Sequence, residues 1–158
     1  MIKNNFKNNI IYIFIFILIF AVDRFSKVYI LNLTEINDSF NLYVTSFLNF
    51  YLIWNKGIAF GLFSFDQNFT YNFITFLIIV ITVIILIIAI KSKDYKGYFF
   101  ISIFSGSVGN LYDRFYYSAV PDFIDFHLND FHWFIFNVAD IFVSLGVICL
   151  IFVEIFFK

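Results

Sequence analysis

Long apolar stretches constrain the fold of this chain more than any other feature of its sequence. Four stretches reach about the twenty residues that a helix, rising roughly 1.5 Å per residue, needs to cross a bilayer core of roughly 30 Å. They cover roughly residues 10–31, 71–90, 98–116 and 137–157. The 158 residues are 62% hydrophobic and 13% charged, which exceeds the apolar content of an ordinary soluble domain. We therefore predict an all-α polytopic membrane protein with four transmembrane helices, forming one membrane-embedded domain over residues 1–158.

The connection between the first two predicted helices carries a second signal. Roughly residues 36–66 form an outer β region, which includes two segments rich in aromatic and β-branched residues, 40–44 and 47–54. Aromatic side chains suit the headgroup zone of a membrane. We therefore expect a small extracytoplasmic β-sheet between helices 1 and 2.

The lysines indicate how the chain is oriented. They gather before the first predicted helix, between the second and third, and at the end of the chain: Lys3, Lys7, Lys91, Lys93, Lys96 and Lys158. The other two connections are acidic and contain one lysine, Lys56. The positive-inside rule then places both termini in the cytoplasm and the acidic connections outside. The net charge of -1, without a basic tract, argues against a nucleic-acid partner.

Two aspartates stand out against the apolar background. Asp122 lies in a short outer segment after Pro121, and Asp140 opens the last apolar stretch one helical turn after Asn137. Ionisable groups beside hydrocarbon are costly and usually functional. If the outer segment folds back onto the helix ends, the two carboxylates meet and share a proton. The ionised member can then deprotonate a water while the protonated member polarises a peptide carbonyl, so Asp122 and Asp140 are the candidate catalytic pair.

Other catalytic chemistry finds little support in the sequence. His127 and His132 are expected to be separate surface residues in a polar loop, because they lack the paired helical spacing of a zinc site. Cys149 lies in an apolar run, where it is expected to be a packing residue. We accordingly expect no metal and no cofactor.

Three further polar groups interrupt the apolar pattern. A spacing of four puts Asp23 and Lys27 on one helical face, either as an ion pair or as an interfacial helix end with snorkelling cations. Asn55 and Gly57 favour a turn between strands. Spacings of three and four gather a third group on one face of the third predicted helix: Asn110, Asp113 and Arg114. We expect Asp113 to have a positioning role rather than a catalytic one.

In their order and spacing these motifs resemble lipoprotein signal peptidase, the bacterial type II signal peptidase, over nearly the full length. The motifs are Asp23-x-x-x-Lys27, Asn55-x-Gly57-x-Ala59-Phe60-Gly61, Gly109-Asn110-x-x-Asp113-Arg114, Asp122-Phe123-Ile124-Asp125 and Phe136-Asn137-x-Ala139-Asp140. The resemblance implies an aspartic endopeptidase whose catalytic pair corresponds to Asp122 and Asp140. The other matched positions would support the site or bind the substrate: Asp23, Lys27, Asn55, Gly57, Asn110, Asp113, Arg114, Asn137 and Ala139.

The resemblance also implies a substrate and a location. The substrate would be a diacylglyceryl-modified prolipoprotein, cut on the amino side of its lipidated cysteine, with membrane lipid as the other partner. The location would be the bacterial cytoplasmic (inner) membrane, with an active site toward the outer face, and a monomer is compatible with this layout. Arg24, Lys56 and Pro121 replace residues that are common in the family. Of these, Pro121 bears on the position of Asp122.

Rival functions remain open at this level. A small membrane transporter or proton-conducting protein would also place acids inside a helical bundle, and a non-catalytic assembly subunit would use them for helix contacts. A transporter would be expected to spread its acids across the depth of the membrane. Here they collect toward the outer side, and the second predicted helix is free of charge. The ordered motifs therefore favour the peptidase.

Overall fold

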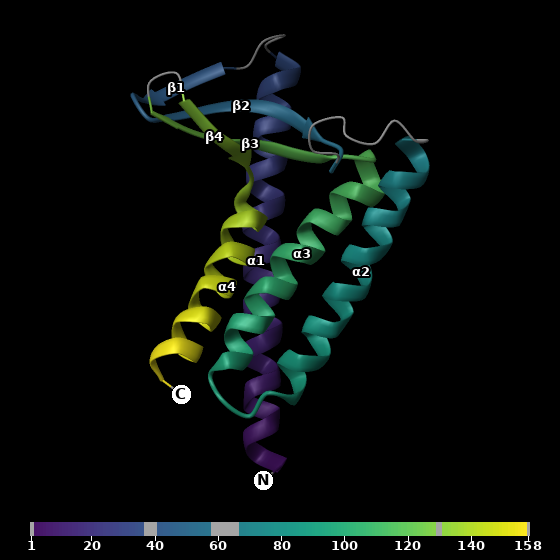
Figure 1. Ribbon diagram of the computed structural model, residues 1–158, viewed down its shortest axis with the longest axis vertical. Helices are drawn as coiled ribbons and strands as arrows, with labels where there is room; N and C mark the ends of the chain where they lie inside the picture. Colours follow the sequence, from purple (N-terminus) through teal and green to yellow (C-terminus); the bar gives the residue numbers. More distant parts are fainter. Residues whose placement is uncertain (1, 37–40, 58–66, 129–130, 158) are drawn as a thin grey trace.

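The computed structural model describes residues 2–36, 41–57, 67–128 and 131–157, and these form four helices and four strands. In chain order the elements are α1 (Ile2–Ile36), β1 (Asn41–Thr45), β2 (Leu48–Asn55), α2 (Gln67–Lys91), α3 (Lys96–Tyr117), β3 (Val120–Leu128), β4 (Phe131–Phe136) and α4 (Val138–Phe156). The helices form a bundle with the sheet across one end (Figure 1). Both termini and the turn between α2 and α3 lie at the opposite end.

The helix α3 is the centre of the bundle. It lies between α2 and α4 (Figure 1), and it also packs against α1. Its small residues permit close helix contact, because the backbones of neighbouring helices can approach them. Its contacts with all three other helices place α3 in the interior of the bundle.

The outer faces of the other helices are apolar. Phe14, Phe25, Phe76 and Phe152 are all more than half exposed, as expected for side chains that face lipid. Among the described residues, three segments are long and apolar enough to cross a membrane: Asn9–Ile36, Phe69–Lys91 and Val138–Phe156. The polar side chains of α3 lower its hydropathy, so the fourth crossing stays a prediction.

The sheet is larger than the sequence predicted. Among the described residues, four strands pair antiparallel in the order β1-β2-β3-β4. The expectation of a sheet built only between helices 1 and 2 is wrong in this respect, because β3 and β4 come from the connection between α3 and α4. The sequence allowed either an extended or a turn backbone at Pro121, and the structure places this proline in a strand. It is tolerated because β3 pairs at that point with β2, while β4 pairs only farther along, from Ile124.

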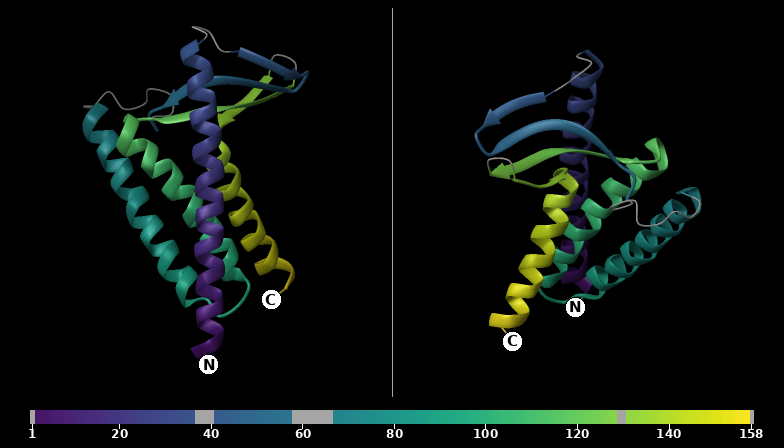
Figure 2. Two further views of the ribbon diagram at one scale, coloured as in Figure 1. Left: turned by 180° about the vertical axis from the view of Figure 1, so that it is seen from behind. Right: turned by 45° about the horizontal axis from the view of Figure 1, so that its top comes forward.

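An apolar layer joins the sheet to the bundle. Ile30 of α1 contacts Phe123 and Ile124 of β3, and side chains of β2 and α4 pack around them. The helix α1 has 35 residues, so it extends beyond the predicted span 10–31 and rises alongside the sheet (Figure 2). This packing fixes β3 against the ends of the helices, which is where the polar side chains gather.

Candidate active site

The connection from β3 through β4 to α4 brings Asp122 and Asp140 to one place. The strand β4 returns antiparallel to β3 and ends directly before Asn137, which is the N-cap of α4. The Asn137 side chain accepts a hydrogen bond from the backbone N–H of Asp140 (3.2 Å), and the Asp140 carboxylate accepts one from the backbone N–H of Asn137 (3.1 Å). This reciprocal capping box fixes the first turn of α4 and the direction of the Asp140 side chain.

Asp122 is held by two side-chain amides. The Nδ2 of Asn137 donates to its Oδ1 at 2.6 Å, and the Nδ2 of Asn55 donates to its Oδ2 at 2.9 Å. Asp122 is only 3% exposed. Burial, together with the charge of Asp140, raises its pKa from 3.8 to about 6, against the lowering effect of the two amides. Asp122 can therefore exchange a proton near neutral pH.

The Asp140 carboxylate accepts a second hydrogen bond, which comes from α3. The Nδ2 of Asn110 donates to its Oδ1 at 2.8 Å, while the Oδ1 of Asn110 accepts a hydrogen bond from the Nζ of Lys27 at 3.0 Å. Because a lysine ammonium can only donate, it fixes which end of the Asn110 amide faces Asp140. The Lys27 charge thus orients a donor toward the candidate catalytic carboxylate without touching it.

A buried ionic network lies behind this contact. Lys27 pairs with Asp23 (2.9 Å) and with Asp113 (2.6 Å). Arg24 pairs with the same two carboxylates, and its guanidinium lies over the Tyr112 ring, 4.6 Å from the ring centroid. Lys27 is 1% exposed and both acids are fully buried, so two cations balance two anions without water. The predicted Asp23 to Lys27 ion pair is confirmed, and the alternative of snorkelling cations at an interface is wrong.

The same network caps α4. The Oδ1 of Asp23 accepts a hydrogen bond from the backbone N–H of Ala139 at 3.0 Å, which satisfies a free donor in the first turn of α4. A Cβ on Gly109 would lie 2.7 Å from the Oδ2 of Asp23, so glycine on α3 lets this carboxylate pass between the helices. Ala139 therefore joins the site through its backbone N–H.

Arg114 lies on a different side of α3 from Asp113. Its guanidinium rests against Gly57, where an added Cβ would meet Nη2 at 2.6 Å, and Gly57 has a φ of 73° that disfavours other residues. The backbone N–H of Gly57 donates to the Oδ1 of Asn55 at 2.7 Å, which closes the turn predicted there. Within the described residues, the buried Nη1 of Arg114 has no hydrogen-bond partner. Arg114 thus offers a free donor to a bound molecule.

A cavity of about 310 Å³ connects these groups. Its polar wall contains Asn55, Asn110, Arg114, Asp122, Asn137 and Asp140. Its apolar wall comes from α2, α3, α4 and the start of β3, and contains Ile78, Ile81, Ile85, Ile103, Val120 and Val143. The cavity therefore combines two carboxylates and several amide donors with a surface suited to an aliphatic chain.

The structure brings most of the predicted residues together but divides them into two layers. Six line the cavity, whereas Asp23, Lys27 and Asp113 lie behind it as an ionic layer. Asp113 pairs across the bundle rather than with its neighbour Arg114. Arg24 was not among the predicted site residues, although its position one residue after Asp23 in an apolar helix was a signal. Ala59, Phe60 and Gly61 lie outside the described residues.

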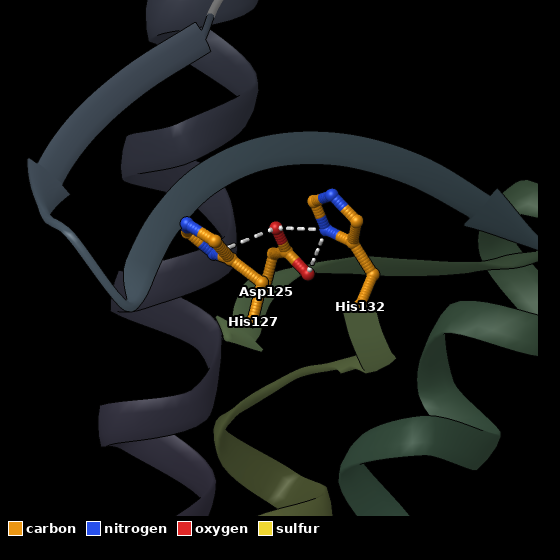
Figure 3. A group of neighbouring side chains, drawn as sticks. All are labelled: Asp125, His127 and His132. Carbon is orange, nitrogen blue, oxygen red and sulfur yellow. Dashed lines mark hydrogen bonds and ion pairs between the residues drawn. The ribbon is translucent and has the colours of Figure 1, made fainter. Parts of the chain in front are cut away.

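The two histidines differ from their expected placement. His127 lies on β3 and His132 on β4, directly opposite each other in the register of the two strands, so the expectation of a polar loop is wrong. Both rings face the carboxylate of Asp125 (Figure 3). They are therefore neighbours, and the expected surface placement is confirmed for His132, whose side chain is 49% exposed.

Known proteins resemble this chain over nearly its whole length. Residues 15–157 match the family described as Signal peptidase (SPase) II. A lipoprotein signal peptidase of Pelagibacter ubique (strain HTCC1062) is 53% identical over 158 residues, which cover 100% of this chain and 95% of that protein. One of Anaplasma phagocytophilum (strain HZ) is 36% identical over 149 residues, 94% of each chain. A solved structure described as a bacterial membrane enzyme is 30% identical, with a TM-score of 0.76 over 93% of this chain and 94% of the other.

Proposed function

Because this chain belongs to the signal peptidase II family, we propose that Asp122 and Asp140 are the catalytic pair with which it hydrolyses a peptide bond. The chain is a peptidase of the membrane, and its reaction is the removal of signal peptides from prolipoproteins. The catalytic type, the residues and the placement in the membrane are our proposals. One observation carries them: Asn137 donates to Asp122 through its side chain and forms a capping box with Asp140, which holds the two carboxylates at one cavity.

The pair would work by sharing a proton. Two carboxyl groups at one buried cavity do not both ionise, so one remains protonated when the other is charged. The ionised carboxylate takes a proton from water, whose oxygen attacks the carbonyl carbon of the substrate. The protonated carboxyl donates its proton to the carbonyl oxygen, and a proton then passes to the departing amine as the C–N bond breaks. Each of the two carboxyl groups accepts hydrogen bonds from amide N–H groups but keeps further lone pairs. Both can therefore still bind the water.

The other groups of the cavity suit substrate binding. The free Nη1 of Arg114 can donate to a backbone carbonyl of an extended substrate. The aliphatic wall from α2 and α3 suits a hydrophobic signal segment or the lipid attached to it. We infer that the substrate carries a diacylglyceryl group on its cysteine and is cut on the amino side of that residue.

Four crossings of the bacterial inner membrane account best for the layout. Polar side chains of α3 face the other helices, so this helix can cross the membrane inside the bundle although its hydropathy is low. The lysine-rich turn between α2 and α3 lies at the same end as both termini (Figure 1). The positive-inside rule then puts that end in the cytoplasm and places the sheet and the cavity toward the outer face.

The decisive experiment is cleavage of a diacylglyceryl-modified prolipoprotein by purified protein in detergent, followed by gel shift. Asp122→Asn and Asp140→Asn should each reduce the rate at least about 100-fold at equal folded yield, because each removes one partner of the proton transfer. Glu154→Gln is the matched control, since that acid is exposed and pairs with Lys96 far from the cavity.

Asp113→Asn separates chemistry from positioning. Asp113 contacts two cations but does not line the cavity, so its variant should lose folded yield yet retain measurable cleavage per folded molecule. Near-parent activity in either Asp122→Asn or Asp140→Asn would overturn the catalytic pair. Cleavage of an unmodified precursor at the same rate would overturn the requirement for lipid.

A further inference from the structure

A second cluster of titratable groups lies on the sheet, apart from the carboxylate pair. Asp125 is fully buried on β3, and the Nδ1 atoms of two imidazoles face its carboxylate, His132 at 2.8 Å and His127 at 3.4 Å. Figure 3 shows one ring on each side of the carboxylate. The ligand-type atoms of the three residues all lie within 4.8 Å of one another. The arrangement is therefore a converging set of two nitrogens and one oxygen.

The strand register builds this cluster. His127 and His132 are opposite residues on β3 and β4, and their rings stack with centroids 5.1 Å apart. Asp125 precedes His127 by two residues, so both side chains leave the same face of β3. An irregularity in the pairing between Asp125 and His127 bends the strand there. The backbone thus fixes all three side chains before any ligand arrives.

Two buried polar atoms beside this cluster are unsatisfied. Within the described residues, the Nδ1 of His127 and the Oδ1 of Asn49 have no hydrogen-bond partner. Asn49 is the residue of β2 directly opposite Asp125, which places the two side chains on the same face of the sheet. Buried atoms of this kind are rare unless something outside the protein chain satisfies them.

The buried carboxylate of the cluster is also a place where a cation would be stabilised. In the part of the chain that the structure describes, the ion-pair partners of Asp125 are these two imidazoles, with no lysine or arginine among them. A fully buried carboxylate is costly unless a cation compensates it. Imidazole nitrogens are good ligands for such a cation.

We propose that Asp125, His127 and His132 bind a divalent transition-metal ion of the zinc class. Three protein ligands from His and Asp, with water in the fourth position, are an established zinc coordination set. Ligand atoms around tetrahedral zinc lie roughly 3.3 Å apart, so the 3.4 Å distance from Asp125 to His127 already fits, and small rotations of the rings would lengthen the 2.8 Å distance to His132 and complete the site. The Oδ1 of Asn49 can accept a hydrogen bond from the bound water.

The proposed metal is not part of the cleavage site. Asp125 follows Asp122 by three residues on β3, so strand alternation directs the two side chains to opposite faces. The ion would instead tie β3 to β4 at the outer end of the hairpin whose other end leads to Asn137. Its expected effect is therefore to stabilise the sheet.

The composition of the chain makes a direct metal-binding test possible. The whole sequence contains two histidines and one cysteine, so protein produced without a histidine tag and stripped with a chelator has few competing ligands. Titration with Co²⁺ should give one ion per chain with the visible d–d absorption of a tetrahedral site, and Zn²⁺ should displace it. Added Zn²⁺ should also raise the thermal unfolding temperature of the parent.

Variants locate the ion and keep the test falsifiable. His132→Ala should weaken the binding of Zn²⁺ at least about 10-fold and abolish the rise in unfolding temperature. The His132 side chain is 49% exposed, so this variant should fold even if Asp125→Asn does not. Asp122→Asn and Cys149→Ser should bind the metal like the parent. Absence of stoichiometric binding, unchanged binding in His132→Ala, or loss of binding in Asp122→Asn would each overturn the proposal.

Discussion

At the scale of single residues, the Asn137 side chain links the two carboxylates of the site. It ends β4, caps α4, donates to Asp122 and accepts from the backbone of Asp140. An aspartate at this position would add a third carboxylate. An alanine would remove the side-chain hydrogen bonds to Asp122 and to the backbone of Asp140. The amide is suited to the position because it donates and accepts at once without a charge.

The raised pKa of Asp122 predicts how stability depends on pH. The folded state holds this proton up to about pH 6 and the unfolded state releases it near 3.8, so the free energy of unfolding should fall as pH rises through this window. The full shift corresponds to on the order of 3 kcal/mol. Asp122→Asn cannot titrate and should lose this part of the slope. Thermal unfolding in detergent at about pH 4, 5, 6 and 7 measures this pH dependence, with Glu154→Gln as the control. Parallel pH profiles for the parent and Asp122→Asn would contradict the prediction.

At the scale of helices, α1 and α3 are joined by charge rather than by apolar packing alone. Lys27 and Arg24 of α1 each bind Asp113 of α3, whose side chain is fully buried. Such pairs add little net stability over an apolar contact, but removing one partner leaves an uncompensated buried charge. The network therefore selects one relative position of the two helices, and through Asn110 and Ala139 it transmits that position to α4.

Lys27→Met tests this role. It leaves two buried carboxylates with one cation, and should destabilise the protein by about 3–5 kcal/mol. It should also reduce cleavage per folded molecule, because Asn110 is no longer oriented toward Asp140. Adding Asp113→Asn restores the charge balance and should recover part of the stability but not the activity. Lys96→Met, which breaks an exposed pair with Glu154, is the matched control and should change little.

The same helices show how far the sequence could predict the site. The polar residues were visible because each interrupts an apolar run, and the spacing of four predicted the pairing of Asp23 with Lys27. The partners across the bundle were not visible, since no periodicity links Arg24 to a residue such as Asp113, 89 positions away. The strands β3 and β4 were not predicted because the connection was interpreted as a short segment after Pro121 and a polar loop, so the contact between the two histidines was missed as well.

At the scale of the whole molecule, the polar chemistry occupies one end. The acids Asp23, Asp113, Asp122 and Asp140 belong to one set of hydrogen bonds next to the sheet, rather than to a series spaced along the bundle. A path for ions or protons would need polar groups between the helices at the other end as well. There, Tyr12, Ala89 and Ile101 form an apolar cluster. This asymmetry favours an enzyme that reaches its substrate from one side of the membrane.

Labelling in intact cells can test which side of the membrane the sheet end of the bundle faces. Replacing the one cysteine by Cys149→Ser leaves a background in which Tyr43→Cys, on the exposed β1, reports the sheet end and Asp94→Cys reports the turn between α2 and α3. A membrane-impermeant maleimide, applied with the outer membrane permeabilised, should label Tyr43→Cys and leave Asp94→Cys unlabelled. Both should react after lysis, which shows that each thiol is accessible. The reverse pattern would place the cavity toward the cytoplasm, where a prolipoprotein that has already been translocated could not be cut at its lipidated cysteine.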